Sequence, residues 1–350
     1  MQTVKPSTEN LNKKGLSAFN FNIKNVLSND GNLTRLVVMM VLVFITMSLL
    51  KPNLFPTVDS LLSMAFQFPE FGILAIAMMI CMVTGGIDLS IIGIANLSSI
   101  LAAVTMVKFI PEGAGAGQIL IVILLAVAIA VLTGLACGLL NGIAISAFGI
   151  PPILTTLGSM QLFTGLGIII TKGKAIYGFP LEFTILGAGS VLYVPIPLIL
   201  FGIIIVTFYI LLKKTSYGLK LYMMGTNPTA STYSGINNLK ITIQTYMYSG
   251  ALAAIAGLLI ASRTNSANAD YGSSYTLQAL LVAILGGVNP NGGFGKVAGV
   301  VVAVLTLQFL STGFNMLHIS NFFKDFIWGA VLIIVMITNY ISNQKQMKRL

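Results

Sequence analysis

Residues 118–148 read QILIVILLAVAIAVLTGLACGLLNGIAISAF, and within them Ile119–Thr133 is almost unbroken apolar sequence. A strand of a membrane barrel would instead alternate apolar and polar residues over about ten positions. A helix needs about 20 mostly apolar residues to cross the hydrocarbon core of a bilayer. This stretch therefore predicts a membrane-spanning α-helix.

The composition of the whole chain agrees with a membrane protein. Of its 350 residues, 56% are hydrophobic and 8% charged, and the mean hydropathy is +0.93. A soluble domain carries about 25% charged residues, so this chain lacks the charge to cover a water-exposed surface. The net charge of +10 predicts basic cytoplasmic loops and not nucleic-acid binding, because no basic run is interleaved with aromatic residues.

Ten segments in all are apolar enough to be candidate spans. They are Thr34–Leu50, Pro69–Thr84, Leu89–Val107, Gln118–Phe148, Pro152–Thr171, Val194–Leu212, Ile241–Ser262, Leu277–Val288, Val297–Leu317 and Phe322–Tyr340. The eighth is too short to cross alone and predicts a half-helix, which only the interior of a bundle tolerates. Thr57–Gln67 predicts a short interfacial helix before the second span. The predicted fold class is an all-α integral membrane protein of about ten transmembrane helices, some broken or half-length.

The distribution of basic residues predicts the orientation. Ten spans place both termini on one side, and thirteen of the 19 basic residues fall on that side. Positive charge collects in cytoplasmic loops, so both termini are expected in the cytoplasm. The expected organisation is a polar N-terminal segment (1–33), a transmembrane domain (34–341) with a cytoplasmic loop at 213–240, and a basic tail (342–350). No apolar run precedes Leu36, so the first span is expected to direct insertion.

The cytoplasmic loop contains the signals of a short helix. Asn227 suits an N-cap, Pro228 the first helical position, and Gly235 the left-handed position after a helix. These residues predict an exposed helix over Pro228–Ser234. It is either a capped connector or a docking site for a soluble partner, and the spacing leaves both open.

Two carboxylates are candidates for the substrate path. Asp88 follows Gly85 and Gly86, which interrupt an apolar run, and Glu70 is expected at the outer end of the second span. A charge at membrane depth costs roughly 2.5–3.5 kcal/mol, so such residues are functional candidates by default. Asp88 can also cap a helix that begins at Leu89, and the two roles are compatible.

Small and amide residues mark the fourth and third spans. Gly134, Gly138 and Gly142 recur at four-residue spacing, which lets two helices approach closely. Asn141 lies beside this ridge and can hydrogen-bond across the contact. Asn96 in the third span can do the same or face a polar substrate, so both are tentative substrate-path residues.

No catalytic, cofactor or metal site is expected in the chain. Neither Gly295-Lys296 nor Gly173-Lys174 lies in the G-x-x-x-x-G-K-[ST] pattern of a phosphate-binding loop. The one histidine, His318, is expected in an outer loop, and Cys81 and Cys137 lie inside apolar segments. Any ATP hydrolysis is therefore expected from a partner.

Five motifs resemble those of one family. They are GGIDLS at 85–90, GLLNG at 138–142, GIPP with TLG at 149–158, GTN to SGI at 225–236, and LGG to GGFG at 285–295. In this order they resemble the bacterial sugar ABC-importer permeases of the ribose/xylose type, which include autoinducer-2 permeases. The resemblance covers roughly 57–339. One departure is Tyr275-Thr276-Leu277-Gln278, where many members carry an acidic residue, and this loosens any assignment to ribose itself.

The resemblance implies a type II-like importer permease that works as a homo- or heterodimer. Its implied partners are two ATP-binding subunits and an extracytoplasmic sugar-binding protein. It also implies that the short cytoplasmic helix is the coupling helix, with Asn227, Pro228, Ala230, Gly235 and Ile236 at the docking site. The predicted function is import of a sugar or similar neutral polyol across the inner membrane. The alternatives are an ion-coupled secondary transporter of a small polar solute, which would depend on Asp88, and a membrane enzyme.

Overall fold

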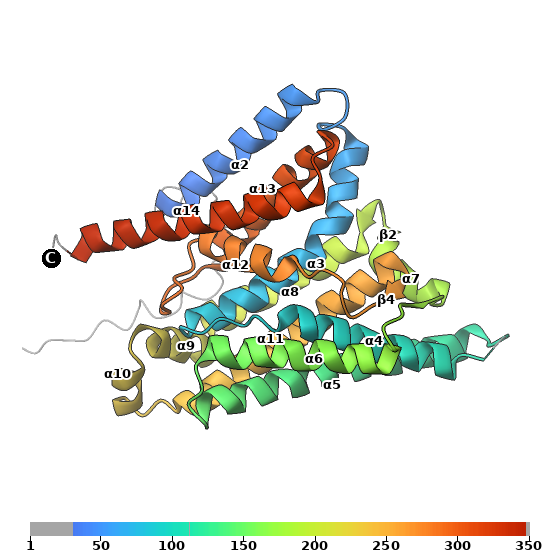
Figure 1. Cartoon of the computed structure of the whole chain (residues 1–350), viewed down its shortest axis with the longest axis horizontal. Helices are drawn as coiled ribbons and strands as arrows, with labels where there is room; N and C mark the ends of the chain where they lie inside the picture. The colour runs from blue at the N-terminus through green and yellow to red at the C-terminus, as the bar shows by residue number, and fades with distance from the viewer. Residues whose placement is uncertain (1–30, 112, 348–350) are drawn as a thin grey trace, which may run out of the picture.

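The computed structural model describes residues 31–111 and 113–347, and most of them are helical (Figure 1). Most of the N-terminal segment predicted at 1–33, and the last three residues of the tail, lie outside the described residues. The helices are α2 (Gly31–Leu50), α3 (Val58–Val83), α4 (Ile91–Phe109), α5 (Ala116–Ser146), α6 (Pro152–Thr171), α7 (Leu181–Ala188), α8 (Ile196–Lys214), α9 (Ser216–Thr226), α10 (Pro228–Tyr233), α11 (Asn238–Thr264), α12 (Tyr275–Leu285), α13 (Val297–Met316) and α14 (Asn321–Met347). Two antiparallel pairs of two-residue strands accompany them. They are β1 (Ile176–Tyr177) with β4 (Ser266–Ala267), and β2 (Ser190–Val191) with β3 (Val194–Pro195).

Each of the ten predicted segments contains a helix, so the predicted all-α membrane fold is confirmed. Among the described residues, eight helices are long and apolar enough to cross a membrane: α2, α3, α4, α5, α6, α8, α11 and α13. The half-helix expected near Leu277–Val288 is α12, which has 11 residues. The expected loop at 213–240 holds one more helix than predicted, since α9 precedes α10.

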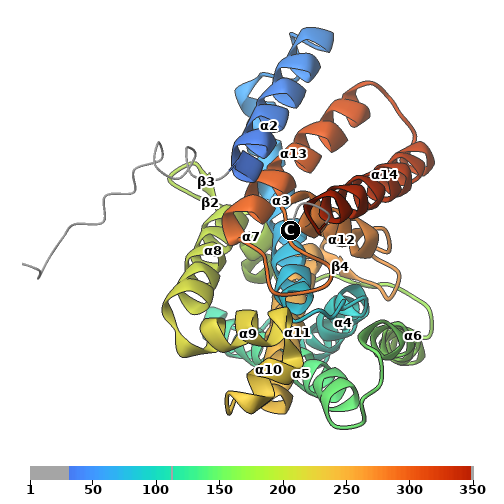
Figure 2. The ribbon, with the colours of Figure 1, turned by 90° about the vertical axis from the view of Figure 1, so that its left-hand side faces the viewer.

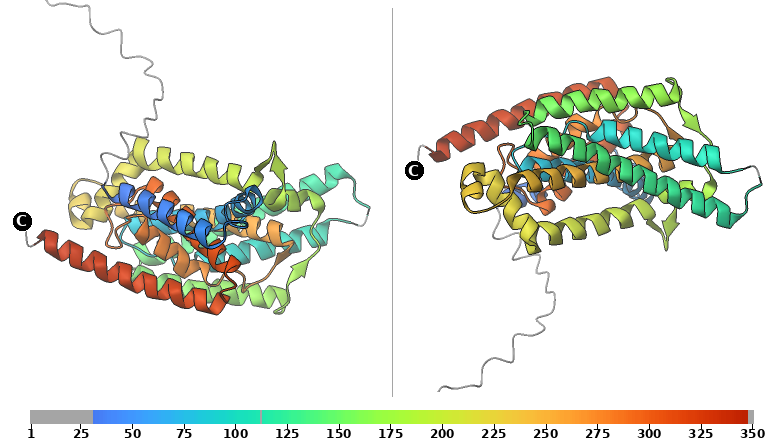
Figure 3. Two further views of the ribbon diagram at one scale, coloured as in Figure 1. Left: turned by 90° about the horizontal axis from the view of Figure 1, so that it is seen from above. Right: turned by 90° about the horizontal axis from the view of Figure 1, so that it is seen from below.

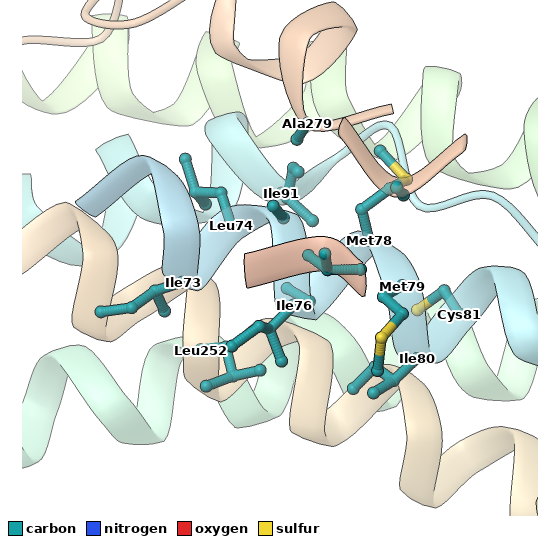
Figure 4. Close-up of a cluster of buried hydrophobic side chains, with 14 of the residues drawn as sticks. Ile73, Leu74, Ile76, Met78, Met79, Ile80, Cys81, Ile91, Leu252 and Ala279 are labelled. Carbon is teal, nitrogen blue, oxygen red and sulfur yellow. The ribbon is translucent and has the colours of Figure 1, made fainter. Parts of the chain in front are cut away.

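Helix α3 lies at the centre of the bundle, surrounded by α4, α8, α11, α12 and α13 (Figure 2). Every residue from Ile73 to Val83 is fully buried. Leu252 from α11, Ile91 from α4 and Ala279 from α12 join these side chains in one apolar cluster (Figure 4). A helix that is hydrophobic on all sides requires protein or lipid on all sides, and here protein supplies the contact.

The start of α3 corrects one prediction. Thr57–Gln67 does not form a separate interfacial helix, because α3 runs without a break from Val58 through Pro69. Thr57 caps this helix by accepting a hydrogen bond from Ser60 N at 3.3 Å. Pro69 leaves one carbonyl without its helical donor, a loss that a buried helix tolerates when its neighbours hold it in place.

The bundle has two distinct ends. Helices α9 and α10 lie at one end together with the C-terminal end of α14, whereas α7 and the short strands lie at the other (Figure 1). Figure 3 shows from two further sides that α10 projects at the first end, opposite the adjoining ends of α4 and α5. The loop that carries the predicted docking helix and the segments around α7 are therefore separated by the length of the spans.

Close contact between α5 and α11 depends on glycines. A Cβ atom at Gly138 would overlap the carbonyl oxygen of Tyr246, and one at Gly142 would come within 2.7 Å of Ile243 Cα. Gly134 and Gly250 face each other across the same contact. Without a side chain the two backbones approach closely, and van der Waals packing then drives association where lipid offers no hydrophobic gain.

We expect Gly138→Ala to destabilise the protein by about 1–3 kcal/mol, because the new methyl group has no space against the backbone of α11. The matched control is Gly158→Ala in α6, where nothing lies within 4 Å of the added Cβ. The control should change stability by no more than about 1 kcal/mol and in the stabilising direction, because alanine favours helix. The midpoint of thermal unfolding in one detergent measures both. Equal midpoints for the two variants would contradict the close contact.

Candidate functional site

Helix α10 is held in one orientation by side-chain hydrogen bonds. Asn227 caps it, its Oδ1 accepting from Ala230 N at 2.9 Å. Asn238, the first residue of α11, donates from Nδ2 to Pro228 O at 2.8 Å and accepts from Ser231 Oγ at 2.8 Å. A six-residue helix has little stability of its own. These bonds supply the order that the short helix cannot provide.

The outer surface of α10 is open. Ala230 is exposed and the Tyr233 side chain is 89% exposed, whereas Ile236 is half-buried and packs against the main apolar cluster. Gly235 has φ +77°, the left-handed conformation predicted from its position. Tyr233 was not among the predicted docking residues, although an aromatic side chain on an exposed helix is typical of protein interfaces.

Near the end of α9, just before α10 begins, four glycines join three segments of the chain. This glycine junction comprises Gly85, Gly225, Gly292 and Gly293. Gly293 N donates to Val83 O at 2.9 Å, and a Cβ at Gly225 would overlap that same carbonyl group. The end of α9 is therefore in backbone contact with the end of the central helix α3 and with the loop between α12 and α13.

A tyrosine reinforces this junction from α9. The Tyr222 hydroxyl donates to Gly295 O at 2.6 Å. Burial raises the pKa of Tyr222 above its ordinary value, so the hydroxyl stays a donor throughout the physiological range.

Asp88 is fully buried in a polar network between α4, α5 and α11. Its Oδ1 accepts from Ser90 N at 3.0 Å and from Ser90 Oγ at 2.6 Å, and its Oδ2 accepts from Ser249 Oγ at 2.7 Å. Asn141 donates to Ser90 Oγ at 2.8 Å. The predicted helix start at Leu89 is two residues early, because α4 begins at Ile91 with Ser90 at the N-cap position. Asp88 still accepts from a backbone N–H at the start of this helix, that of Ser90.

The other two tentative path residues lie in separate groupings. Asn96 does not bond to the fourth span; its Nδ2 donates to Ala269 O at 2.7 Å and to Tyr271 O at 2.9 Å. Glu70 lies near the middle of the 26-residue α3 and not at its end. The structure thus joins Asp88 to Asn141 through Ser90 and leaves Asn96 and Glu70 outside that network.

Glu70 forms an ion pair that the sequence did not reveal. Its two carboxylate oxygens accept from Arg263 Nη2 at 2.7 Å and Arg263 Nε at 3.1 Å, and Tyr275 OH donates at 3.2 Å. Arg263 belongs to the last turn of α11, one residue beyond the predicted span Ile241–Ser262. The partners are about 190 residues apart in the chain, so only the packed bundle brings them together.

We expect Asp88→Ala to lower the free energy of unfolding by about 3 kcal/mol, since two serine hydroxyls and Ser90 N–H lose their buried acceptor. Asp88→Asn should cost only about 1 kcal/mol, because the amide keeps one oxygen for Ser90. The exposed Asp270→Ala serves as control and should change stability by less than about 0.5 kcal/mol. Thermal unfolding in detergent gives the order of the three variants. A loss for Asp88→Asn as large as that for Asp88→Ala would show that charge, not hydrogen bonding, is required.

A multi-pass helical bundle with a half-helix inside it, a carboxylate buried at its core and an ordered helix projecting at one end defines a membrane transport protein. Residues 60–336 match the model of the family described as branched-chain amino acid transport system / permease component. The chain therefore belongs to this permease family, as its motifs predicted.

Relatives of known function extend the comparison. The autoinducer 2 import system permease protein LsrD of Enterobacter sp. (strain 638) is 32% identical over 90% of this chain and 95% of its own length. The ribose import permease protein RbsC of Bacillus subtilis (strain 168) is 33% identical over 84% of this chain and 88% of its own. RbsC of Haemophilus influenzae is 30% identical over 93% and 98%. No solved structure matches the chain.

Proposed function

We propose that this chain is the transmembrane subunit of an ATP-driven importer that carries a sugar or similar neutral polyol across the inner membrane. Relatives that import ribose or autoinducer 2 align with it over most of both chains. The small number of charges in the spans agrees with an uncharged substrate, because a charged solute would require a compensating charge at membrane depth.

Helix α10 is the observation that carries the proposal. It is ordered by Asn227 and Asn238 and presents Ala230 and Tyr233 to the solvent. A preorganised, exposed helix is suited to docking because it loses little conformational entropy when a partner binds. The proposed partner on this surface is an ATP-binding subunit. The proposed partners elsewhere are an extracytoplasmic sugar-binding protein and a second permease subunit, identical or related.

The glycine junction would couple a partner docked on α10 mechanically to the core of the bundle. Movement of α10 is transmitted through α9 to Gly225, which touches Val83 at the end of α3 and Gly293 in the loop after α12. Because no side chain separates these backbones, a displacement of α9 would displace the end of α3 and the loop after α12 directly. Binding and release of ATP on the partner would thereby tilt α3 and α12 together and alternate access to the two sides.

The proposal includes an orientation in the membrane and a source of energy. The end that carries α10 is cytoplasmic, in agreement with the positive charge of Lys213, Lys214, Lys220 and Lys240 in and around that loop. The chain uses no cofactor and no ATP site of its own in this proposal. ATP is bound and hydrolysed by the partner subunits.

We expect Tyr233→Ala to reduce co-purification of the ATP-binding subunits about tenfold, since an exposed interface aromatic can contribute about 1.4 kcal/mol or more. Ala230→Glu should weaken it further, because it places a charge in the same contact. The matched control is Tyr177→Ala in β1, where another tyrosine, 67% exposed, lies at the opposite end of the molecule. Quantitative mass spectrometry of the complex in mild detergent measures the ratio.

Undiminished partner recovery with both α10 variants would refute docking at α10. If no ATP-binding subunit accompanies the wild-type chain, and uptake collapses with an ionophore while surviving ATP depletion, the chain is an ion-coupled transporter instead.

A further inference from the structure

A polar cavity lies beside the Glu70–Arg263 pair, between α3, α11, α12, α13 and α14. Its volume is about 70 Å³, room for about five water molecules at about 10–15 Å³ each. Its lining residues are Gln67, Phe71, Arg263, Tyr275, Gln278, Leu307, Gln308, Ser311 and Trp328. None of these was among the tentative substrate-path residues.

The cavity has no net charge. Arg263 is the one cation in its lining, and the Glu70 carboxylate, 2% exposed, neutralises it through two hydrogen bonds. An anionic ligand would have to compete with Glu70, and a cationic ligand would meet a carboxylate already paired. The remaining N–H groups of Arg263, whose side chain is 31% exposed, can still donate to a neutral acceptor.

Three glutamines from three helices converge on this cavity. Within the part of the chain that the structure describes, each donates an amide hydrogen only to a hydroxyl one turn away on its own helix. Gln67 donates to Ser63 at 3.0 Å, Gln278 to Ser274 at 3.3 Å and Gln308 to Thr312 at 3.1 Å. Each amide oxygen and second N–H therefore stays available to a ligand. Polar side chains within a membrane bundle are costly without a partner, and a hydroxyl-rich solute supplies both donors and acceptors.

Aromatic rings complete the lining. Trp328, 5% exposed, packs against Phe314 with ring centroids 6.0 Å apart, and Phe71 packs against Tyr275 at 5.8 Å. These rings form a packed apolar wall, and the amides are the groups that suit the hydroxyls of a solute.

We infer that this cavity is a binding site for a neutral polyhydroxylated solute on its way through the permease, with Gln67, Gln278 and Gln308 as hydrogen-bonding residues and Trp328 in its wall. The inference rests on the proposed transport function, because it assigns the site at which that function handles its substrate.

The chain contains a single tryptophan, so the fluorescence of Trp328 reports this cavity alone. We expect D-ribose, D-xylose, D-glucose or xylitol, titrated separately into the purified full-length chain, to produce a saturable change in Trp328 emission with at least one of them. D-ribose 5-phosphate should produce a much weaker change, since the cavity offers its phosphate no free cation.

Substitutions in the cavity lining test whether the solute binds there. Gln278→Leu and Gln308→Leu should each weaken the apparent affinity about three- to tenfold, the loss of one hydrogen bond to a neutral group. Ser311→Leu, which fills the cavity without removing an amide, should abolish the response. The matched control is Gln118→Leu at the exposed start of α5, which should leave it unchanged.

The outcomes distinguish this site from the transport proposal. No saturable response to any of the four probes, or an equal response in Ser311→Leu, overturns the site. Responses as expected together with a wild-type chain that binds no ATP-binding subunit leave the site standing and refute the ATP-driven importer. If the chain supports ATP-driven uptake of D-ribose and neither Gln308→Leu nor Ser311→Leu changes it, the importer stands and the site is refuted.

Discussion

The burial of α3 on all sides is the constraint on which the rest of the bundle depends. From Ile73 to Val83 no residue of this helix reaches the surface, so every neighbour must present an apolar face to it. In the most apolar 18-residue stretch of α3, 89% is buried inside the protein, against 17% in the corresponding stretches of α5 and of α6. The peripheral helices thus leave their outward faces to lipid or to another subunit, and the centre is fixed.

A buried central helix also explains where the polar groups lie. Once α3 ends at Val83, the chain turns inside the protein, where backbone groups must find partners without water. Gly293 N donates a hydrogen bond to Val83 O, and the Asp88 carboxylate accepts hydrogen bonds from Ser90 and Ser249. The same turn places Gly85 against the loop after α12. The interruption of the helix after Val83 would be costly at membrane depth. Its contacts with α9 and with the loop after α12 hold it in place.

The glycine junction and the proposed solute cavity lie at opposite stretches of the central helix α3. The glycine junction contacts α3 at Val83, whereas Glu70, Phe71 and Gln67 line or adjoin the cavity nearer its start. Helix α12 is connected to both regions, because Tyr275 and Gln278 face the cavity and the loop after Leu285 enters the junction. Helices α3 and α12 therefore physically connect the glycine junction with the proposed solute cavity.

Features that depend on local pattern follow from the amino-acid sequence alone. Apolar runs set the ten segments, and the length of Leu277–Val288 marked a half-helix. Asn227, Pro228 and Gly235 set α10 through capping and backbone conformation that neighbouring residues decide alone. Long-range contacts decided the rest. The Glu70–Arg263 pair joins α3 to α11, and the cavity draws on α3, α11, α12, α13 and α14. No local pattern records which distant helix a side chain faces, because that depends on the packing of the whole bundle around α3.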